Sequence, residues 1–169
     1  SNRRWVEVTK RPDRDISIAP MGKGSSFALG IALARPDTKV ILLDGDGSLE
    51  MNLGSIITVA GQRPKNLYHF VIQNGVYATT GGQPIAGPDD LSFSDMAKAA
   101  GYKHSYYFDD LEEFSLDAER ILNQDGPVMI CVRTVAEIRT SQDRALQRAM
   151  PGRKSPSETF RKLRSELNS

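Results

Sequence analysis

The stretch "TKVILLDGDGSLEMNLG", from Thr38 to Gly54, decides the fold class of this chain. Its continuous apolar run up to Asp44 is typical of a strand buried on both faces of a parallel sheet. Beyond Gly45-Asp46-Gly47, apolar residues recur at helical spacing, at Leu49, Leu53, Ile56, Ile57 and Ala60. A turn that leads from a strand into a helix excludes the β-hairpin that Asp-Gly otherwise favours, because a hairpin needs alternating strands on both sides.

The rest of the chain alternates short apolar runs with helical patterns. Strands are predicted over 15–19, 38–44, 66–73, 104–108 and 127–134, and helices over 24–34, 91–101 and 110–122. A loop rich in Gly, Thr and Pro is predicted between the strand at 66–73 and about Asp90. This alternation predicts an α/β fold with a single doubly wound, mostly parallel sheet and helices on both faces.

The C-terminal part has its own helical signal. Ser155-Pro156-Ser157-Glu158 forms a capping box with Pro at the first helical position. The helix it opens carries an apolar stripe of Phe160, Leu163 and Leu167, which must pack on another surface. We therefore expect one domain over residues 1–169, in which 134–169 form a C-terminal extension that ends in a docking helix.

Composition narrows the class of protein. With 169 residues, 25% charged residues and a formal net charge of +1, the chain is expected to be one soluble globular domain. No apolar run approaches the roughly 20 residues that span a bilayer, and no signal peptide opens the chain, so a cytoplasmic location is expected. The near-neutral charge argues against nucleic acid as the main partner. A single cysteine, Cys131, excludes an internal disulfide and is expected to be core.

Two polar residues follow neighbouring predicted strands. Asp46 and Asn74 come just past the strand ends, and the carboxyl ends of parallel strands meet at one edge of a sheet. Carboxylate and amide oxygens suit Mg²⁺ or Ca²⁺ better than zinc. The backbone N–H groups of Gly47 and Ser48 can hold a phosphate, and Gly45 and Gly47 let the main chain approach it. These features predict a metal that bridges the protein to a diphosphate.

The same residues carry a family resemblance. Gly45-Asp46-Gly47, followed after 26 residues by Asn74, resembles the cofactor motif of thiamine diphosphate (TPP) enzymes. "APMGKGSSFALGIALA", from Ala19, resembles the "GSMG" turn and small-residue helix of that family. "QNGVYATTGGQP", from Gln73, resembles a loop of sulfopyruvate and phosphonopyruvate decarboxylases. The resemblance implies the diphosphate-binding domain of a TPP enzyme.

The resemblance also implies roles for individual residues. The Mg²⁺ ligands would be the side chains of Asp46 and Asn74 and the backbone carbonyl of Val76. The residues that contact the diphosphate would be Gly45, Gly47, Ser48 and Tyr77. Met21 would hold the cofactor in its bent conformation, and the Ala19 carbonyl would accept a hydrogen bond from its 4′-amino group. Two departures stand out, since Ala19-Pro20 replaces the usual Gly-Ser and Gln73 stands where many relatives have Asn or Asp.

The functional role of several other polar residues is less specific in the sequence. Thr79, Thr80 and Gln83 follow the metal loop where the acidic end of a substrate would arrive, and an ordinary role as polar loop residues stays open. Glu50 is interpreted as a solvated or partner-facing carboxylate, and His69 and His104 as structural residues. "GKGSS" does not fit a nucleotide P-loop, because Ser17 and Gly24 stand where that motif needs Gly and Ser or Thr.

The function that the resemblance implies is that of one subunit of a TPP- and Mg²⁺-dependent decarboxylase. Sulfopyruvate, converted to sulfoacetaldehyde and CO₂, is the expected substrate. In the family a glutamate on a pyrimidine-binding domain activates the cofactor, and this chain has no room for that domain. A separate pyrimidine-domain (alpha) subunit, and hence a hetero-oligomer, is therefore expected. The alternatives are a phosphonopyruvate decarboxylase, another TPP decarboxylase or carboligase subunit, and a non-catalytic TPP- and metal-binding module.

Overall fold

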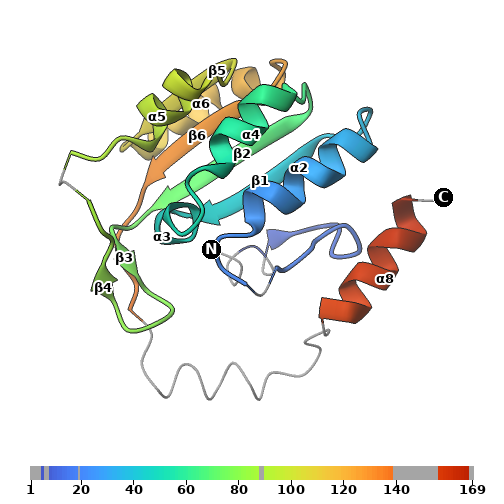
Figure 1. The fold of residues 1–169 in the computed structure, drawn as a ribbon, viewed down its shortest axis with the longest axis horizontal. Coiled ribbons are helices and arrows are strands. Elements are labelled where there is room, and N and C mark those ends of the chain that lie inside the picture. Colours follow the sequence, from blue (N-terminus) through green and yellow to red (C-terminus); the bar gives the residue numbers. More distant parts are fainter. Residues whose placement is uncertain (1–4, 6–7, 19, 88–89, 139–155, 168–169) are drawn as a thin grey trace.

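The computed structural model describes residues 5, 8–18, 20–87, 90–138 and 156–167 (Figure 1). The helices are α2 (Gly24–Ala34), α3 (Asp46–Glu50), α4 (Ser55–Gln62), α5 (Phe93–Ala100), α6 (Leu111–Leu122) and α8 (Pro156–Leu167). The strands are β1 (Val40–Gly45), β2 (Leu67–Gln73), β3 (Val76–Tyr77), β4 (Gln83–Pro84), β5 (His104–Phe108) and β6 (Val128–Arg133). Within these ranges, no helix is both long and apolar enough to cross a membrane.

The main sheet has four parallel strands in the order β1-β2-β6-β5. In its register, Asp44 on β1 lies opposite Val71 on β2, which lies opposite Cys131 on β6. The short strands β3 and β4 pair with each other as an antiparallel hairpin, which projects beyond the carboxyl ends of β1 and β2 (Figure 1). The predicted α/β class with a parallel sheet is confirmed.

Helices cover both faces of the sheet, as the sequence predicts. On one face, α2, α4 and α5 pack over a buried cluster that includes Ala32, Val59, Val71, Ala97 and Met129. On the other face, α6 packs over a smaller cluster of Tyr68, Phe70, Phe108, Ile121, Val128 and Ile130. Figure 1 shows α2 and α4 running side by side along the first face. The core therefore has two separate layers, one on each side of the sheet.

The small-residue helix α2 has the predicted bounds. Ala28 and Ala32 are almost completely buried, so the helix can lie close to β1 and α4. The Ser25 and Ser55 hydroxyls, one on α2 and one on α4, are hydrogen-bonded at 2.6 Å in the buried contact. This bond gives both buried hydroxyls a partner, as burial requires.

The single helix predicted after the Gly45-Asp46-Gly47 turn is wrong in one respect, because two helices replace it. Helix α3 ends at Glu50, and α4 begins at Ser55. Between them the backbone follows i→i+3 bonds, from Asn52 N–H to the Leu49 carbonyl at 3.0 Å and from Ser55 N–H to the Asn52 carbonyl at 3.0 Å. Tighter turns of this kind keep Leu49 and Ile56 on the buried side, so the periodicity continues across the break.

The strand predicted over 15–19 is also wrong. Residues 15–18 belong to no strand, and Ala19 lies outside the described residues. Ile16 and Ile18 are half-buried without joining the sheet. Two alternating apolar residues are too few to specify a ladder, and a packed loop buries them equally well.

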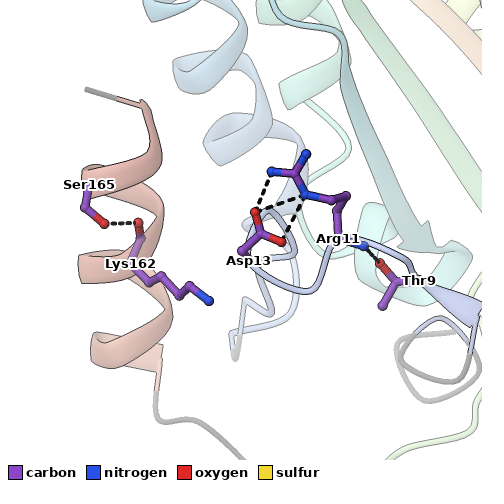
Figure 2. Close-up of polar contacts among 5 residues, drawn as sticks. All are labelled: Thr9, Arg11, Asp13, Lys162 and Ser165. Carbon is purple, nitrogen blue, oxygen red and sulfur yellow. Dashed lines mark hydrogen bonds and ion pairs between the residues drawn. The ribbon is translucent and has the colours of Figure 1, made fainter. Parts of the chain in front are cut away.

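The C-terminal helix α8 lies beside α2 and the N-terminal segment. The rings of Phe160 and Phe27 meet edge to face, with their centroids 5.3 Å apart. Figure 2 shows Lys162 pointing from α8 toward Asp13, which Arg11 binds at 2.7 Å. The hydrogen bond from Arg11 lowers the pKa of Asp13 to about 2, and the positive charge of Lys162 acts in the same direction. The predicted cap Ser155 and the side chains of Leu163 and Leu167 lie outside what the structure describes.

Candidate functional site

The two predicted metal ligands lie together at the carboxyl edge of the sheet. Asp46 opens α3 directly after β1, and Asn74 follows β2, the neighbouring parallel strand. Asp46 is only 2% exposed, and its carboxylate Oδ2 accepts a hydrogen bond from the Gly75 N–H at 2.7 Å. This bond joins the two strand ends directly. The juxtaposition predicted from parallel strand order is therefore confirmed.

Both polar side chains are oriented by nearby backbone. The Asp46 Oδ1 atom accepts from the Gly47 N–H at 2.9 Å, and the Asn74 Oδ1 atom accepts from the Val76 N–H at 3.0 Å. Gly75 makes this turn possible with φ of +72°, a conformation that other residues rarely adopt. The Val76 carbonyl accepts from the Ala78 N–H at 2.9 Å. Each of these oxygens has a second lone pair that can face a cation.

Tyr77 and Gly47 are in direct contact. A Cβ on Gly47 would lie only 2.5 Å from Cε1 of the Tyr77 ring, so glycine is the residue that lets this ring lie against the turn. The Tyr77 hydroxyl donates to Glu50 Oε2 at 2.6 Å. That hydrogen bond raises the pKa of Tyr77, because it stabilises the protonated hydroxyl beside a carboxylate.

The turn that contains Met21 is tied to the same edge. The Gly22 N–H donates to Ser48 Oγ at 3.1 Å, and Gly22 has φ of +76°. A Cβ on Gly22 would lie 3.1 Å from the Met51 Cβ, so the turn passes close to the end of α3. Met21, directly before Gly22, is half-buried. The structure thus ties the turn that contains Met21 to Ser48, whereas Ala19 lies outside the described residues.

The three candidate substrate residues lie on the β3–β4 hairpin and its loop. Thr79, Thr80 and Gln83 are all exposed. Their recorded hydrogen bonds stay within the hairpin, from Thr80 Oγ1 to the Tyr77 carbonyl at 3.3 Å and from Gln83 Nε2 to the Thr80 carbonyl at 3.4 Å. The predicted contact of these hydroxyl and amide groups with an anionic substrate stays a prediction.

His69 and Asp44 form a buried pair behind the site. His69 is fully buried in β2, and its Nε2 atom lies 3.6 Å from Asp44 Oδ2. Its Nδ1 atom lies 3.4 Å from the Tyr102 hydroxyl, and the other Asp44 oxygen accepts from the Gly45 N–H at 3.0 Å. The interpretation of His69 as a structural residue stays a prediction. His104 is half-buried and stacks on Tyr106 with ring centroids 6.4 Å apart.

The donor set fits a hard cation that also binds an anion. A carboxylate, an amide oxygen and a backbone carbonyl lie in the two turns that the hydrogen bond from Gly75 to Asp46 joins, and Mg²⁺ commonly completes a set of such ligands with phosphate oxygens and water. Across the described residues, no group of three or more His, Cys, Asp and Glu side chains could hold a metal. A zinc site of the usual kind is therefore absent from that part of the chain, whereas a Mg²⁺–diphosphate site needs only the groups at this edge.

Two residues of this edge were missed or misread in the sequence. Glu50 is half-buried and bound to Tyr77, and so does not fit the first of its two interpretations, a solvated carboxylate, whereas the second, a partner-facing carboxylate, stays a prediction. Its position four residues after Asp46 was a usable signal, because residues at i and i+4 share one side of a helix. Gly75 supplies the donor to Asp46, and a glycine directly after a strand-end Asn is a typical left-handed turn position.

Comparison with known proteins agrees with this geometry. Residues 4–132 match the family described as thiamine pyrophosphate enzyme, C-terminal TPP binding domain. Sulfopyruvate decarboxylase subunit beta of Methanothermobacter thermautotrophicus is 36% identical over 127 residues, which cover 75% of this chain and 65% of that protein. Phosphonopyruvate decarboxylase of Streptomyces viridochromogenes is 35% identical over 131 residues, which cover 77% of this chain and 32% of that protein.

A solved structure is similar in fold as well. The thiamine diphosphate-dependent 4-hydroxybenzoylformate decarboxylase of Rhodococcus jostii RHA1 superposes with a TM-score of 0.59 at 25% identity, over 70% of this chain and 24% of that one. The chain spans less than two thirds of the length of each of these three proteins. The family match nevertheless covers well over half of this chain, including both strand ends of the candidate site. The chain therefore belongs to the thiamine pyrophosphate enzyme family, of which it carries the C-terminal TPP-binding domain.

Proposed function

We propose that this chain is the diphosphate-binding part of a TPP- and Mg²⁺-dependent 2-oxo acid decarboxylase. The observation that carries the proposal is the hydrogen bond between Asp46 and Gly75, which sets a nearly buried carboxylate beside Asn74 at the carboxyl edge of the sheet. The relatives named above include decarboxylases of sulfopyruvate and phosphonopyruvate. Sequence identity above one third to both favours this reaction class over other TPP chemistry.

In this proposal different groups at the carboxyl edge of the sheet contact different parts of the cofactor. Asp46, Asn74 and the Val76 carbonyl bind Mg²⁺, which in turn binds the diphosphate. The backbone of Gly45, Gly47 and Ser48, together with Tyr77, contacts the diphosphate, and Met21 and the Ala19 carbonyl contact the organic rings. When bound, TPP supplies a nucleophilic carbon and an electron sink for decarboxylation. The protein orients that carbon and provides electrostatic stabilisation.

The substrate is proposed to be a small 2-oxo acid with a second anionic group, sulfopyruvate first and phosphonopyruvate as the alternative. Thr79, Thr80 and Gln83 are the exposed polar groups nearest in sequence to the metal ligands, and hydroxyl and amide donors bind sulfonate and phosphonate alike. These residues are the proposed contacts for that second anionic group.

A partner chain is proposed to complete the active site. One relative is itself called a beta subunit, a name that implies a second kind of subunit in that enzyme. A separate pyrimidine-domain chain is proposed to bring the glutamate that activates the cofactor, so that the site lies between two chains. Residues 1–169 are proposed as the diphosphate- and Mg²⁺-binding domain, and 134–169 as an extension whose last helix docks on the assembly.

The first test removes the metal ligands singly. Replacing Asp46 or Asn74 by Ala is expected to abolish Mg²⁺-dependent TPP binding, measured by calorimetry, while the far-ultraviolet circular dichroism stays unchanged. Asp37→Ala and Asn123→Ala are matched controls, because both residues are exposed and lie away from the carboxyl edge of the sheet. TPP affinity that survives both ligand variants would refute the site assignment.

The second test examines the reaction and the partner. CO₂ release from sulfopyruvate and from phosphonopyruvate is measured with the chain alone and with a co-purified pyrimidine-domain protein. The expected result is no turnover by the chain alone and turnover in the mixture. Turnover by the isolated chain would refute the divided site. TPP binding without turnover in any mixture would instead favour a non-catalytic TPP- and metal-binding module.

A further inference from the structure

Tyr77 connects two separate parts of the candidate site. Its hydroxyl donates to Glu50 on α3 at 2.6 Å, and its ring lies against Gly47 on the same helix. Its backbone carbonyl accepts from the N–H groups of Thr80 at 3.1 Å and Gly82 at 3.0 Å, which form the loop of the β3–β4 hairpin. A single residue therefore joins α3, which begins with Asp46, to the hairpin.

The hydrogen bond between Tyr77 and Glu50 is well placed to hold this connection. It joins residues 27 positions apart, is partly buried and has a carboxylate as its acceptor. Hydrogen bonds to a charged acceptor are about twice as strong as neutral ones. At the other end of the hairpin, the Ile85 N–H donates to the Gly75 carbonyl at 3.1 Å, and the Ile85 side chain reaches the neighbourhood of Gly47. Tyr77 and Ile85 together seat the hairpin on α3.

The position of the hairpin matters for the groups that it carries. Val76 directly precedes Tyr77, so any movement of Tyr77 also moves the Val76 carbonyl, a proposed Mg²⁺ ligand. Gln83 pairs with Tyr77 across the hairpin. A displacement of the Tyr77 ring would therefore change the geometry on the side of Asp46 that faces the hairpin.

We propose that Glu50 is a positioning residue, which fixes Tyr77 against Gly47 and thereby seats the β3–β4 hairpin for binding of Mg²⁺ and the TPP diphosphate. The part of this inference that concerns the cofactor rests on the proposed function. In this proposal Glu50 acts through Tyr77, because its Oε2 atom accepts a hydrogen bond from the Tyr77 hydroxyl.

The first experiment follows the hairpin without any cofactor. Amide hydrogen exchange at Gly82 and Ile85, the donors that close the hairpin, is compared in wild type, E50A, E50Q, Y77F and the double variant E50A/Y77F. Exchange is expected to rise about tenfold in E50A and in Y77F, since each loses one hydrogen bond to a charged group. The double variant should be no faster than either single one, and E50Q should stay near wild type because its amide oxygen still accepts from Tyr77.

Matched controls separate this effect from general destabilisation. E119A removes an exposed glutamate of α6, and Y107F removes the hydroxyl of an exposed tyrosine on β5. Neither should change exchange at Gly82 or Ile85. Unchanged exchange in E50A and Y77F, or fully additive effects in the double variant, would overturn the clamp between Glu50 and Tyr77.

The second experiment measures Mg²⁺-dependent TPP affinity of the same variants in the complex with the partner subunit. E50A and Y77F are expected to lose about tenfold in affinity, and E50Q to recover most of it. Faster exchange with unchanged TPP affinity would overturn the positioning role for the cofactor. A wild-type complex that binds no TPP would refute the proposed function itself, and the exchange result would still decide the clamp.

Discussion

The two ends of the parallel sheet use backbone hydrogen bonds for opposite purposes. At the amino ends of the strands, the Asn66 amide group donates to the carbonyls of Ala32 at 3.2 Å, Arg35 at 2.9 Å and Thr38 at 2.7 Å. At the carboxyl ends, Asp46 accepts from the N–H groups of Gly47 in its own turn and of Gly75 in the neighbouring turn, and Asn74 accepts from the Val76 N–H. Each of these side-chain oxygens has a further lone pair that can face a cation. One end is closed by the protein itself, whereas the other is proposed to bind Mg²⁺ and the TPP diphosphate.

This contrast teaches where stability and binding reside in the chain. Groups at the amino end satisfy one another, so their loss should lower the free energy of unfolding and leave binding unchanged. Groups at the carboxyl end are the proposed ligands of Mg²⁺ and the TPP diphosphate, so their loss should affect binding first. Paired substitutions of the same residue type at the two ends test this separation.

The largest loss of stability is expected from a substitution at Gly126, which lies at the amino end of β6. A Cβ there would lie 2.7 Å from the Leu67 carbonyl oxygen and 2.8 Å from that of Pro64, and backbone atoms cannot move aside cheaply. Gly126→Ala should therefore lower the free energy of unfolding in urea by about 3 kcal/mol. Gly30→Ala on α2 is the control, since no atom lies within 4 Å of its added Cβ. That change should stabilise the chain slightly, because alanine favours a helix. Equal stability of the two variants would contradict the close packing at Gly126.

The second-largest effect is expected from the matched substitutions Asn66→Ala and Asn74→Ala, which should differ in whether they change the free energy of unfolding or the affinity for Mg²⁺-TPP. The first variant removes a hydrogen-bond donor from the three carbonyls of Ala32, Arg35 and Thr38 and should lose about 2 kcal/mol of stability. Its affinity for Mg²⁺-TPP should stay within about twofold of wild type. The second variant loses one local bond, to the Val76 N–H, and should unfold near the wild-type urea midpoint without binding TPP. A stability loss that is the same in both variants would break the proposed division between the ends.

Alanine substitutions at Gly45 and Gly47 compare two neighbouring positions at the carboxyl end of the sheet. A Cβ at Gly45 meets nothing within 4 Å, whereas one at Gly47 would overlap the Tyr77 ring. Gly47→Ala should cost about 1 kcal/mol, since the ring and its hairpin can shift, and should weaken Mg²⁺-TPP binding strongly. Gly45→Ala should unfold like wild type in the same urea titration. Tight TPP binding by Gly47→Ala would show that Tyr77 need not lie against the turn.

Much of this architecture was predictable because it depends on local pattern and on parallel topology. The apolar run at 38–44 overlaps most of β1 (Val40–Gly45), and the small-residue segment at 24–34 has the same bounds as α2. The parallel order of β1 and β2 then placed Asp46 next to the turn at Asn74. These features need no knowledge of distant contacts, apart from the rule that the carboxyl ends of parallel strands share an edge.

The features that escaped prediction depend on contacts between distant segments. Strands β3 and β4 have two residues each, too few for a periodic signal, and Tyr77 of β3 is hydrogen-bonded to Glu50, 27 residues away. The break between α3 and α4 was hidden because its tight turns preserve the apolar spacing of Leu49 and Ile56. The run at 15–19 failed as a strand because its two isoleucines are half-buried without ladder bonds.

The smallest effect is expected for the reactivity of the Cys131 thiol, which tests whether the core between the two ends of the sheet is accessible from the candidate site. Cys131 lies in the middle of β6 with no exposed surface, and burial raises the pKa of its thiol from 9.0 to about 12. At pH 8 its thiolate fraction should be on the order of a thousandfold below that of an unfolded chain, and no reagent should reach it from the carboxyl edge. Ellman's reagent should therefore leave the native chain unmodified and react fully in urea.

The pH dependence of the unfolding free energy is a second test that the Cys131 thiol is buried in a closed core. Between pH 9 and about 12 the folded chain retains a thiol proton that the unfolded chain loses, so the stabilisation is present below pH 9 and decreases as the pH rises through this range. The difference in unfolding free energy between wild type and Cys131→Ala should shrink accordingly in urea titrations at pH 8 and pH 10. Rapid native modification that TPP and Mg²⁺ suppress would contradict a closed core, because it would require a path from the cofactor edge to the centre of the sheet.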